Sequence, residues 1–301
     1  MAKRTFDEHI DAIKKQGEYI KGSSGNMIWV KHYLPSTTEE GKHKGQIPTI
    51  FVHGFSGSSY PYEKFYDYFK KKKRPTIIYD HRGHGFSEDA PDQKYSIEYF
   101  SEDLKTLIDT LGLEKVNLAG HCFGGMVVMD FCGRYPDRVN AITVMSSRLK
   151  YSDNFKDRLV EDILKESDRL SKIGLKKLFF FREPIELDYT TIKNDGDWYI
   201  PRIIEDLKRT SLNVAIKILE DLFVEDLTEA ATTIKIPTLI IHGKKDTVNP
   251  VENAYDIHSH IKDSQLEIFR QAAHCHYTVD PKSVLPKHIY KFLKKTKSFS
   301  A

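Results

Sequence analysis

The stretch Asn117-Leu118-Ala119-Gly120-His121-Cys122-Phe123-Gly124-Gly125 decides the fold, because an apolar, strand-like run passes directly into a Gly-x-Cys-x-Gly turn and then into a helical pattern. Such a tight strand-to-helix turn leaves no room for a Cβ atom two residues before or two residues after its central side chain. Gly120 and Gly124 meet that requirement. Cys122 then stands at a helix N-terminus, where backbone N–H groups and the helix dipole favour a thiolate.

A buried structural cysteine is the alternative for Cys122, since free cysteine is among the most buried residue types. The strand before it, the helix after it and the candidate partners downstream favour a reactive thiol.

The composition is that of a soluble globular protein. The chain has 301 residues, which is enough for one large α/β domain or for a core domain that carries an insertion. Its net charge of +3 gives no electrostatic case for binding nucleic acid. The dense basic run at residues 70–74 fits a solvated helix end.

Neither a targeting segment nor a metal motif is evident. The first residues lack the apolar core of a secretory signal, and no apolar run approaches the ~18 residues of a membrane span, so we expect a cytoplasmic protein without a membrane partner. Cys122, Cys132 and Cys275 have neither disulfide-like nor zinc-like spacing, so we expect free thiols, no metal and no cofactor. The oligomeric state is left open.

Strand and helix patterns alternate through most of the chain and predict a largely parallel, doubly wound sheet of the α/β class. We expect strands at residues 18–21, 27–34, 47–52, 76–79, 115–119, 139–145, 236–241 and 266–270, the first two as antiparallel edge strands. We expect helices at residues 6–13, 62–73, 97–111, 126–135, 255–261 and 284–293.

The alternation stops between residues 147 and 233, where the pattern indicates charged amphipathic helices. We therefore predict a helical cap at 147–233, inserted between two strands of a core formed by residues 1–146 and 234–301.

Polar side chains follow three of the predicted strands. Cys122, Asp246 and His274 each come directly after a strand, and the carboxyl ends of parallel strands meet at one edge of a sheet. We expect these three side chains to lie close together.

These motifs together resemble the α/β-hydrolase superfamily, and the resemblance covers almost the whole chain. The motifs are His53-Gly54-Phe55 after the first buried strand, an Arg-Gly-x-Gly-x-Ser loop at 82–87, the elbow at Cys122, Asp246 after a Gly-x-x-Asp turn, and a late histidine. The resemblance implies that Cys122 is the nucleophile, Asp246 the acid and His274 the base. It also implies an oxyanion hole formed by the backbone N–H groups of Phe55 and Phe123.

The cysteine departs from most of the superfamily, which places serine at the elbow. A cysteine there is similar to dienelactone hydrolases and polyhydroxyalkanoate synthases, although the first lack a cap of this size and most of the second are longer. The elbow residue therefore predicts an active site without naming its substrate.

The leading hypothesis is a hydrolase that cleaves a carboxylic ester or thioester of a small-molecule acyl substrate through an acyl-thioenzyme. An acyltransferase with the same triad is a rival, because a thioester can pass its acyl group to an alcohol, an amine or a thiol. A small-ligand receptor that retains the fold is a third hypothesis.

Several residues have alternative interpretations. His276 could replace His274 as the base, and Asp153 could replace Asp246 as the acid. His53 and His121 lie at the reactive edge and are candidates for contacting substrate, but each could equally brace a loop or pack.

Overall fold

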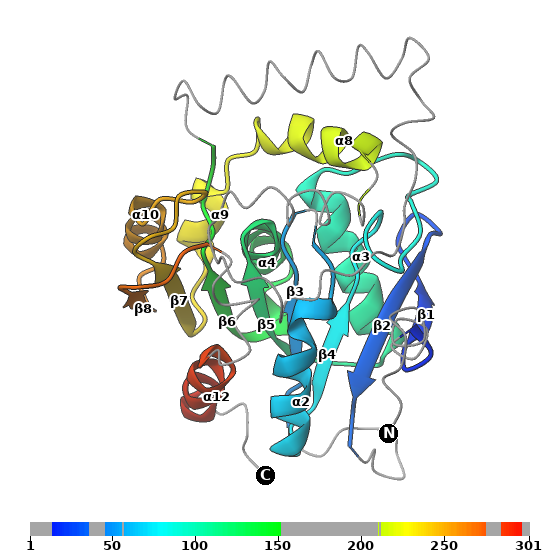
Figure 1. Cartoon of the computed structure of the whole chain (residues 1–301), viewed down its shortest axis with the longest axis horizontal. Coiled ribbons are helices and arrows are strands. Elements are labelled where there is room, and N and C mark those ends of the chain that lie inside the picture. Colours follow the sequence, from blue (N-terminus) through cyan, green and yellow to red (C-terminus); the bar gives the residue numbers. More distant parts are fainter. Residues whose placement is uncertain are drawn as a thin grey trace, which may run out of the picture.

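An eight-stranded sheet forms the centre of the molecule. The computed structural model describes residues 14–35, 46–55, 57–151, 210, 212–274 and 284–296. The strand order is β1-β2-β4-β3-β5-β6-β7-β8 (Figure 1). The strands are β1 Glu18–Lys21, β2 Met27–Tyr33, β3 Thr49–Val52, β4 Thr76–Tyr79, β5 Val116–His121, β6 Val139–Met145, β7 Thr238–Gly243 and β8 Ser264–Phe269.

Strand direction confirms the predicted sheet. β1 pairs with β2, and β2 with β4, in antiparallel fashion, whereas every pair from β4 through β3 to β8 is parallel. β5, which leads to Cys122, lies between β3 and β6 in the interior of the sheet.

Helices cover both faces of the sheet (Figure 1). The helices in the described ranges are α2 Glu63–Lys71, α3 Ile97–Thr110, α4 Phe123–Arg134, α8 Leu212–Leu222, α9 Thr228–Thr233, α10 Glu252–His260 and α12 Leu285–Lys295, with short 3-10 turns at Tyr60–Tyr62 and Pro136–Arg138. Ile50 and Val52 of β3 pack into the apolar cluster that includes α3, α4, α9 and α10, and Phe51 packs into the cluster that includes α2 and α12. Both faces are therefore apolar, which explains the continuous apolar runs of these strands.

Two strands begin two residues later than the sequence pattern predicted. The predicted strand at 47–52 begins at Thr49, and the one at 236–241 begins at Thr238. Each start directly follows a proline, and proline has no N–H to donate to a neighbouring strand. The carbonyls of Pro48 and Pro237 still accept hydrogen bonds from neighbouring strands, from Asn117 and Ile142 at 2.7 and 3.0 Å.

Parts of the predicted cap are described. α8 lies against the loop after β4, because a Cβ atom on Gly83 of that loop would lie 2.7 Å from Val214 Cγ1 of the helix. Thr210, just before α8, forms a β-bridge with His84. α9 packs on α4 instead, with Leu227 and Ala231 buried in the core cluster. Residues 152–209, which hold most of the predicted cap, and the predicted helix at 6–13 lie outside the described residues, so the domain boundaries stay a prediction.

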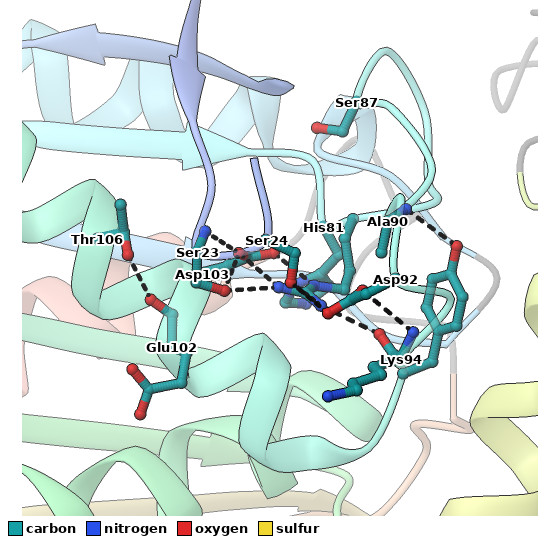
Figure 2. Close-up of polar contacts among 12 residues, drawn as sticks. Ser23, Ser24, His81, Ser87, Ala90, Asp92, Lys94, Glu102, Asp103 and Thr106 are labelled. Carbon is teal, nitrogen blue, oxygen red and sulfur yellow. Dashed lines mark hydrogen bonds and ion pairs between the residues drawn. The ribbon is translucent and has the colours of Figure 1, made fainter. Parts of the chain in front are cut away.

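A buried ion pair explains the arginine of the Arg-Gly-x-Gly-x-Ser loop. Arg82 donates from Nε to Asp103 Oδ2 and from Nη2 to Asp103 Oδ1, both at 2.7 Å. Ser23, in the turn between β1 and β2, donates its hydroxyl to Asp103 Oδ1 at 2.8 Å. Figure 2 shows Ser23 and Ser24 next to the Asp103 carboxylate. The pair fastens the loop after β4 to α3 and to the first hairpin.

Gly85 and Ser87 of the same loop fit closely around Asp80. A Cβ atom on Gly85 would lie 2.3 Å from Asp80 Oδ2, and Gly85 has a positive φ of 50°. Ser87 donates its hydroxyl to the Asp80 carbonyl at 2.6 Å.

None of the helices in the described ranges has the length and hydropathy needed to cross a membrane.

Candidate active site

Cys122 occupies a strained turn between β5 and α4. Its φ and ψ are 53° and −119°, a region that non-glycine residues seldom adopt and that costs about 1–3 kcal/mol. Hydrogen bonds of its backbone N–H and carbonyl hold it there. Its N–H donates to Met145 O at 2.9 Å, and its carbonyl accepts from Gly125 N at 2.9 Å and from Ser147 Oγ at 2.7 Å.

The two elbow glycines have no room for a side chain, as predicted. A Cβ atom on Gly120 would lie 2.2 Å from Gly124 O, and one on Gly124 would lie 2.3 Å from Val52 O. The loop after β3 also comes close, because a Cβ atom on Gly54 would lie 3.3 Å from Cys122 Cβ.

His274 and Asp246 meet across the loops that follow β8 and β7. His274 Nδ1 lies 2.8 Å from Asp246 Oδ2, with both side chains buried. The other carboxylate oxygen of Asp246 accepts the backbone N–H groups of Val248 at 3.0 Å and Asn249 at 2.7 Å. The carboxylate is therefore fixed by its own loop and presents one oxygen to the imidazole.

His274 also forms a side-chain hydrogen bond with Cys122. Burial alone would raise the pKa of the Cys122 thiol, but the charge and hydrogen bond of His274 and the charge of Arg148 hold that pKa below its ordinary value. Burial alone would lower the pKa of His274, yet the charge of Cys122 and the hydrogen bond to Asp246 raise it well above its ordinary value. These directions favour a thiolate next to an imidazolium.

Asp246 completes this electrostatic arrangement. Burial acts to raise the pKa of its carboxyl, but the hydrogen bond and charge of His274 outweigh burial and lower the pKa. The structure thus brings together the three residues that the sequence places after separate strands.

The candidate oxyanion-hole residues lie beside Cys122. Phe123 is the first residue of α4, where a backbone N–H has no acceptor within the helix. Phe55 directly follows Gly54, whose backbone approaches Cys122. Their role in binding an oxyanion stays a prediction.

His53 and His121 both make hydrogen bonds to the backbone. His53 accepts from the N–H of His81 at 2.9 Å through Nε2, so its Nδ1 is the donor to Gly54 O at 2.8 Å. His121 Nε2 donates to His274 O at 2.9 Å, and burial followed by the charge of His274 lowers the pKa of His121 to about 3. Both residues have the geometry of loop braces, and their contact with substrate stays a prediction.

Two further polar residues, Asn249 and Arg148, lie at the site. The sequence interpretation did not single them out. Asn249 Nδ2 lies 3.7 Å from Cys122 Sγ, and Arg148 Nε donates to Asn249 Oδ1 at 2.6 Å. The sequence carries only a weak signal for either residue, namely its position in the chain. Asn249 lies three residues after Asp246 in the same loop, and Arg148 lies just after a predicted strand.

The other candidates fall outside the described residues. They are the alternative base His276, the alternative acid Asp153, and Cys275. Within the residues that the structure describes, no group of three histidine, cysteine, aspartate or glutamate side chains could hold a metal ion.

The fold and the edge at which these loops meet are those of the α/β hydrolases. A family model described as the alpha/beta hydrolase fold matches residues 48–281, and the chain belongs to this family. It is 26% identical to the AB hydrolase superfamily protein YisY of Bacillus subtilis over 237 residues, which cover 75% of this chain and 84% of that protein.

Other relatives are named for ester chemistry. The chain is 28% identical to a pimeloyl-[acyl-carrier protein] methyl ester esterase of Neisseria meningitidis over 204 residues, covering 66% of this chain and 76% of the esterase. Among solved structures, an esterase from Exiguobacterium antarcticum superposes with a TM-score of 0.71 at 23% identity, covering 92% of this chain and 99% of the esterase. That superposition supports the fold, and the family is one of hydrolytic enzymes.

Proposed function

We propose that this chain hydrolyses a carboxylic ester or thioester with Cys122 as nucleophile, His274 as proton carrier and Asp246 as the residue that orients the imidazole. The observation that carries the proposal is the hydrogen-bonded series from the Cys122 thiol through His274 to Asp246, whose second link measures 2.8 Å. The similarity to a methyl ester esterase supports the substrate class.

The first half of the reaction forms an acyl-enzyme. The Cys122 thiolate attacks the carbonyl carbon, and the carbonyl electron pair moves to oxygen, where the N–H groups of Phe55 and Phe123 stabilise the charge. The intermediate collapses as the bond to the leaving group breaks. The His274 imidazolium gives its proton to that leaving group.

The second half releases the acid. Neutral His274 takes a proton from water, the resulting hydroxide adds to the thioester carbonyl, and the Cys122 thiolate leaves. Asp246 keeps the His274 tautomer fixed throughout. An alcohol or thiol in place of water would give acyl transfer, the rival reaction that a thioester intermediate permits.

Intact-mass spectrometry with p-nitrophenyl esters of increasing acyl length tests this proposal. We expect one acyl adduct that forms on the native protein, is absent from Cys122→Ala, and is not turned over by His274→Ala. Cys132→Ala is the matched control, because this second cysteine is buried in the core and burial raises its pKa. An adduct that persists in Cys122→Ala would refute the proposal. Ester products formed with added alcohols would identify a transferase.

A further inference from the structure

Asn249 lies between the Cys122 sulfur and a buried cation. Its side chain is almost fully buried, with the residue 2% exposed. Its Nδ2 lies 2.6 Å from Ser146 O and 3.7 Å from Cys122 Sγ, and its Oδ1 lies 2.6 Å from Arg148 Nε. Each atom of the amide head therefore has a defined neighbour.

The hydrogen-bond partners fix the orientation of this amide. A guanidinium only donates and a backbone carbonyl only accepts, so Oδ1 must face Arg148 and Nδ2 must face Ser146. The amide nitrogen carries two hydrogens. With one directed at the Ser146 carbonyl, the other is available to the Cys122 sulfur.

Arg148 is held firmly in place. It is 7% exposed, and its Nη2 donates to Val248 O at 2.7 Å. Its guanidinium lies 4.0 Å from the centre of the Tyr151 ring, within the range of a cation–π contact. A positive charge at Oδ1 polarises the amide and makes its N–H groups stronger donors.

We propose that Asn249, polarised by Arg148, donates a hydrogen bond to the Cys122 sulfur and stabilises it as a thiolate. Asn249 then contacts the reacting atom, and Arg148 is a positioning residue that holds and polarises the Asn249 amide while its charge also acts on the sulfur. The inference rests on the proposed function, since it concerns the same nucleophile.

The charged groups that act on this sulfur agree with that assignment. They are His274 from the loop after β8, Arg148 from the segment after β6, and Asp246 from the loop after β7. His274 and Arg148 lower the pKa of the thiol, and Asp246 raises it. The Asn249 backbone N–H also binds Asp246 Oδ1, so one residue contacts both the acid and the sulfur.

The test is the rate at which iodoacetamide alkylates Cys122 in the folded full chain, measured as a function of pH. The extent of alkylation is read from the mass of the Cys122 peptide after digestion. We expect Asn249→Leu to raise the apparent pKa of the thiol by about one unit, which is about tenfold less thiolate at pH values below the pKa. Arg148→Met should raise it by less. Asn249→Asp keeps the shape but places an oxygen at the sulfur, so it should raise the pKa most.

Asn140→Leu is the matched control. Asn140 is a half-buried asparagine of β6 that donates to Asn117 Oδ1 at 2.8 Å, and its loss should leave the alkylation profile unchanged. Asn249→Asp guards against misfolding of the leucine variant. Unchanged profiles in folded Asn249→Asp and Arg148→Met would overturn the inference.

Alkylation and acylation separate the two proposals. A shifted alkylation profile without any acyl adduct on the native protein would sustain the role of Asn249 and reject the proposed hydrolysis. An acyl adduct on the native protein with unshifted alkylation profiles in the variants would sustain the proposed hydrolysis and reject the role of Asn249.

Discussion

At the scale of single residues, Gly124 is a position at which even one added methyl group should destabilise the fold. An added Cβ would meet the carbonyl oxygens of Val52 and His53 at 2.3 and 2.4 Å, and these backbone atoms belong to or adjoin a buried strand. We expect Gly124→Ala to lower the free energy of unfolding by about 1–3 kcal/mol, a range typical of overpacked cores. Urea denaturation measures the loss.

Gly133→Ala controls for the loss of a glycine from the same helix. A Cβ atom there would meet Ala230 Cβ at 3.3 Å, a contact about 1 Å longer than those at Gly124. Alanine is favoured over glycine inside a helix by about 1 kcal/mol, so this variant should be neutral or slightly stabilising. Equal losses in both variants would contradict the steric argument.

At the scale of elements, the ion pair between Arg82 and Asp103 joins α3 to the loop after β4. Both side chains are buried, with exposures of 0% and 1%. Asp103→Ala would leave a buried guanidinium without its carboxylate, a change that typically costs about 3–5 kcal/mol. We expect a fall of this size in the unfolding free energy, measured by thermal or urea denaturation.

The exposed pair between Lys150 and Asp226 provides the comparison. Its side chains are 53% and 48% exposed, and surface pairs contribute about 0–1 kcal/mol. Lys150→Ala removes this pair and leaves Asp226 bonded to the Thr228 N–H at the start of α9, so it should change stability little. A similar loss in both variants would show that burial does not set the value of these pairs.

The local sequence pattern predicts that a strand or helix exists better than it predicts where the element begins or which side chains it contacts. The strands and the edge at which Cys122, Asp246 and His274 meet follow from apolar runs and parallel order, which are properties of short segments. The starts at Thr49 and Thr238 depend on hydrogen bonds to neighbouring strands. The contact of Arg148 with Asn249 depends on two loops far apart in the chain, so no spacing rule reveals it.

At the scale of the whole molecule, buried histidines make stability depend on pH. Burial, followed by the charges of His53 and His84, holds the pKa of His81 well below 6.5, and burial also lowers the pKa of His242. The pKa of His121 falls to about 3. A histidine with a lowered folded pKa binds more protons when unfolded. Its stabilising contribution is complete above 6.5 and is lost as pH falls toward the folded value.

We therefore expect the free energy of unfolding to decline as pH drops below 6.5, by about 1.4 kcal/mol per pH unit for each such histidine. Urea titrations between pH 4 and 8, in about half-unit steps, measure the slope. His121→Asn should flatten it, whereas His260→Asn, at a partly exposed position on α10, should not. A slope unchanged by His121→Asn would count against its burial in the neutral form.

β6 and β7 are neighbours in the sheet, although residues 146–237 separate them along the chain. The pairing of Met145 with Ile241 fixes the register of the two strands directly. The length of the segment between them therefore does not set that register. Insertions or deletions between Tyr151 and Thr210 would leave Ser147, Arg148 and the strand ends that carry Cys122, Asp246 and His274 in place. Over evolutionary time, a lineage can change the length of this stretch and still inherit the three strand-end side chains unaltered.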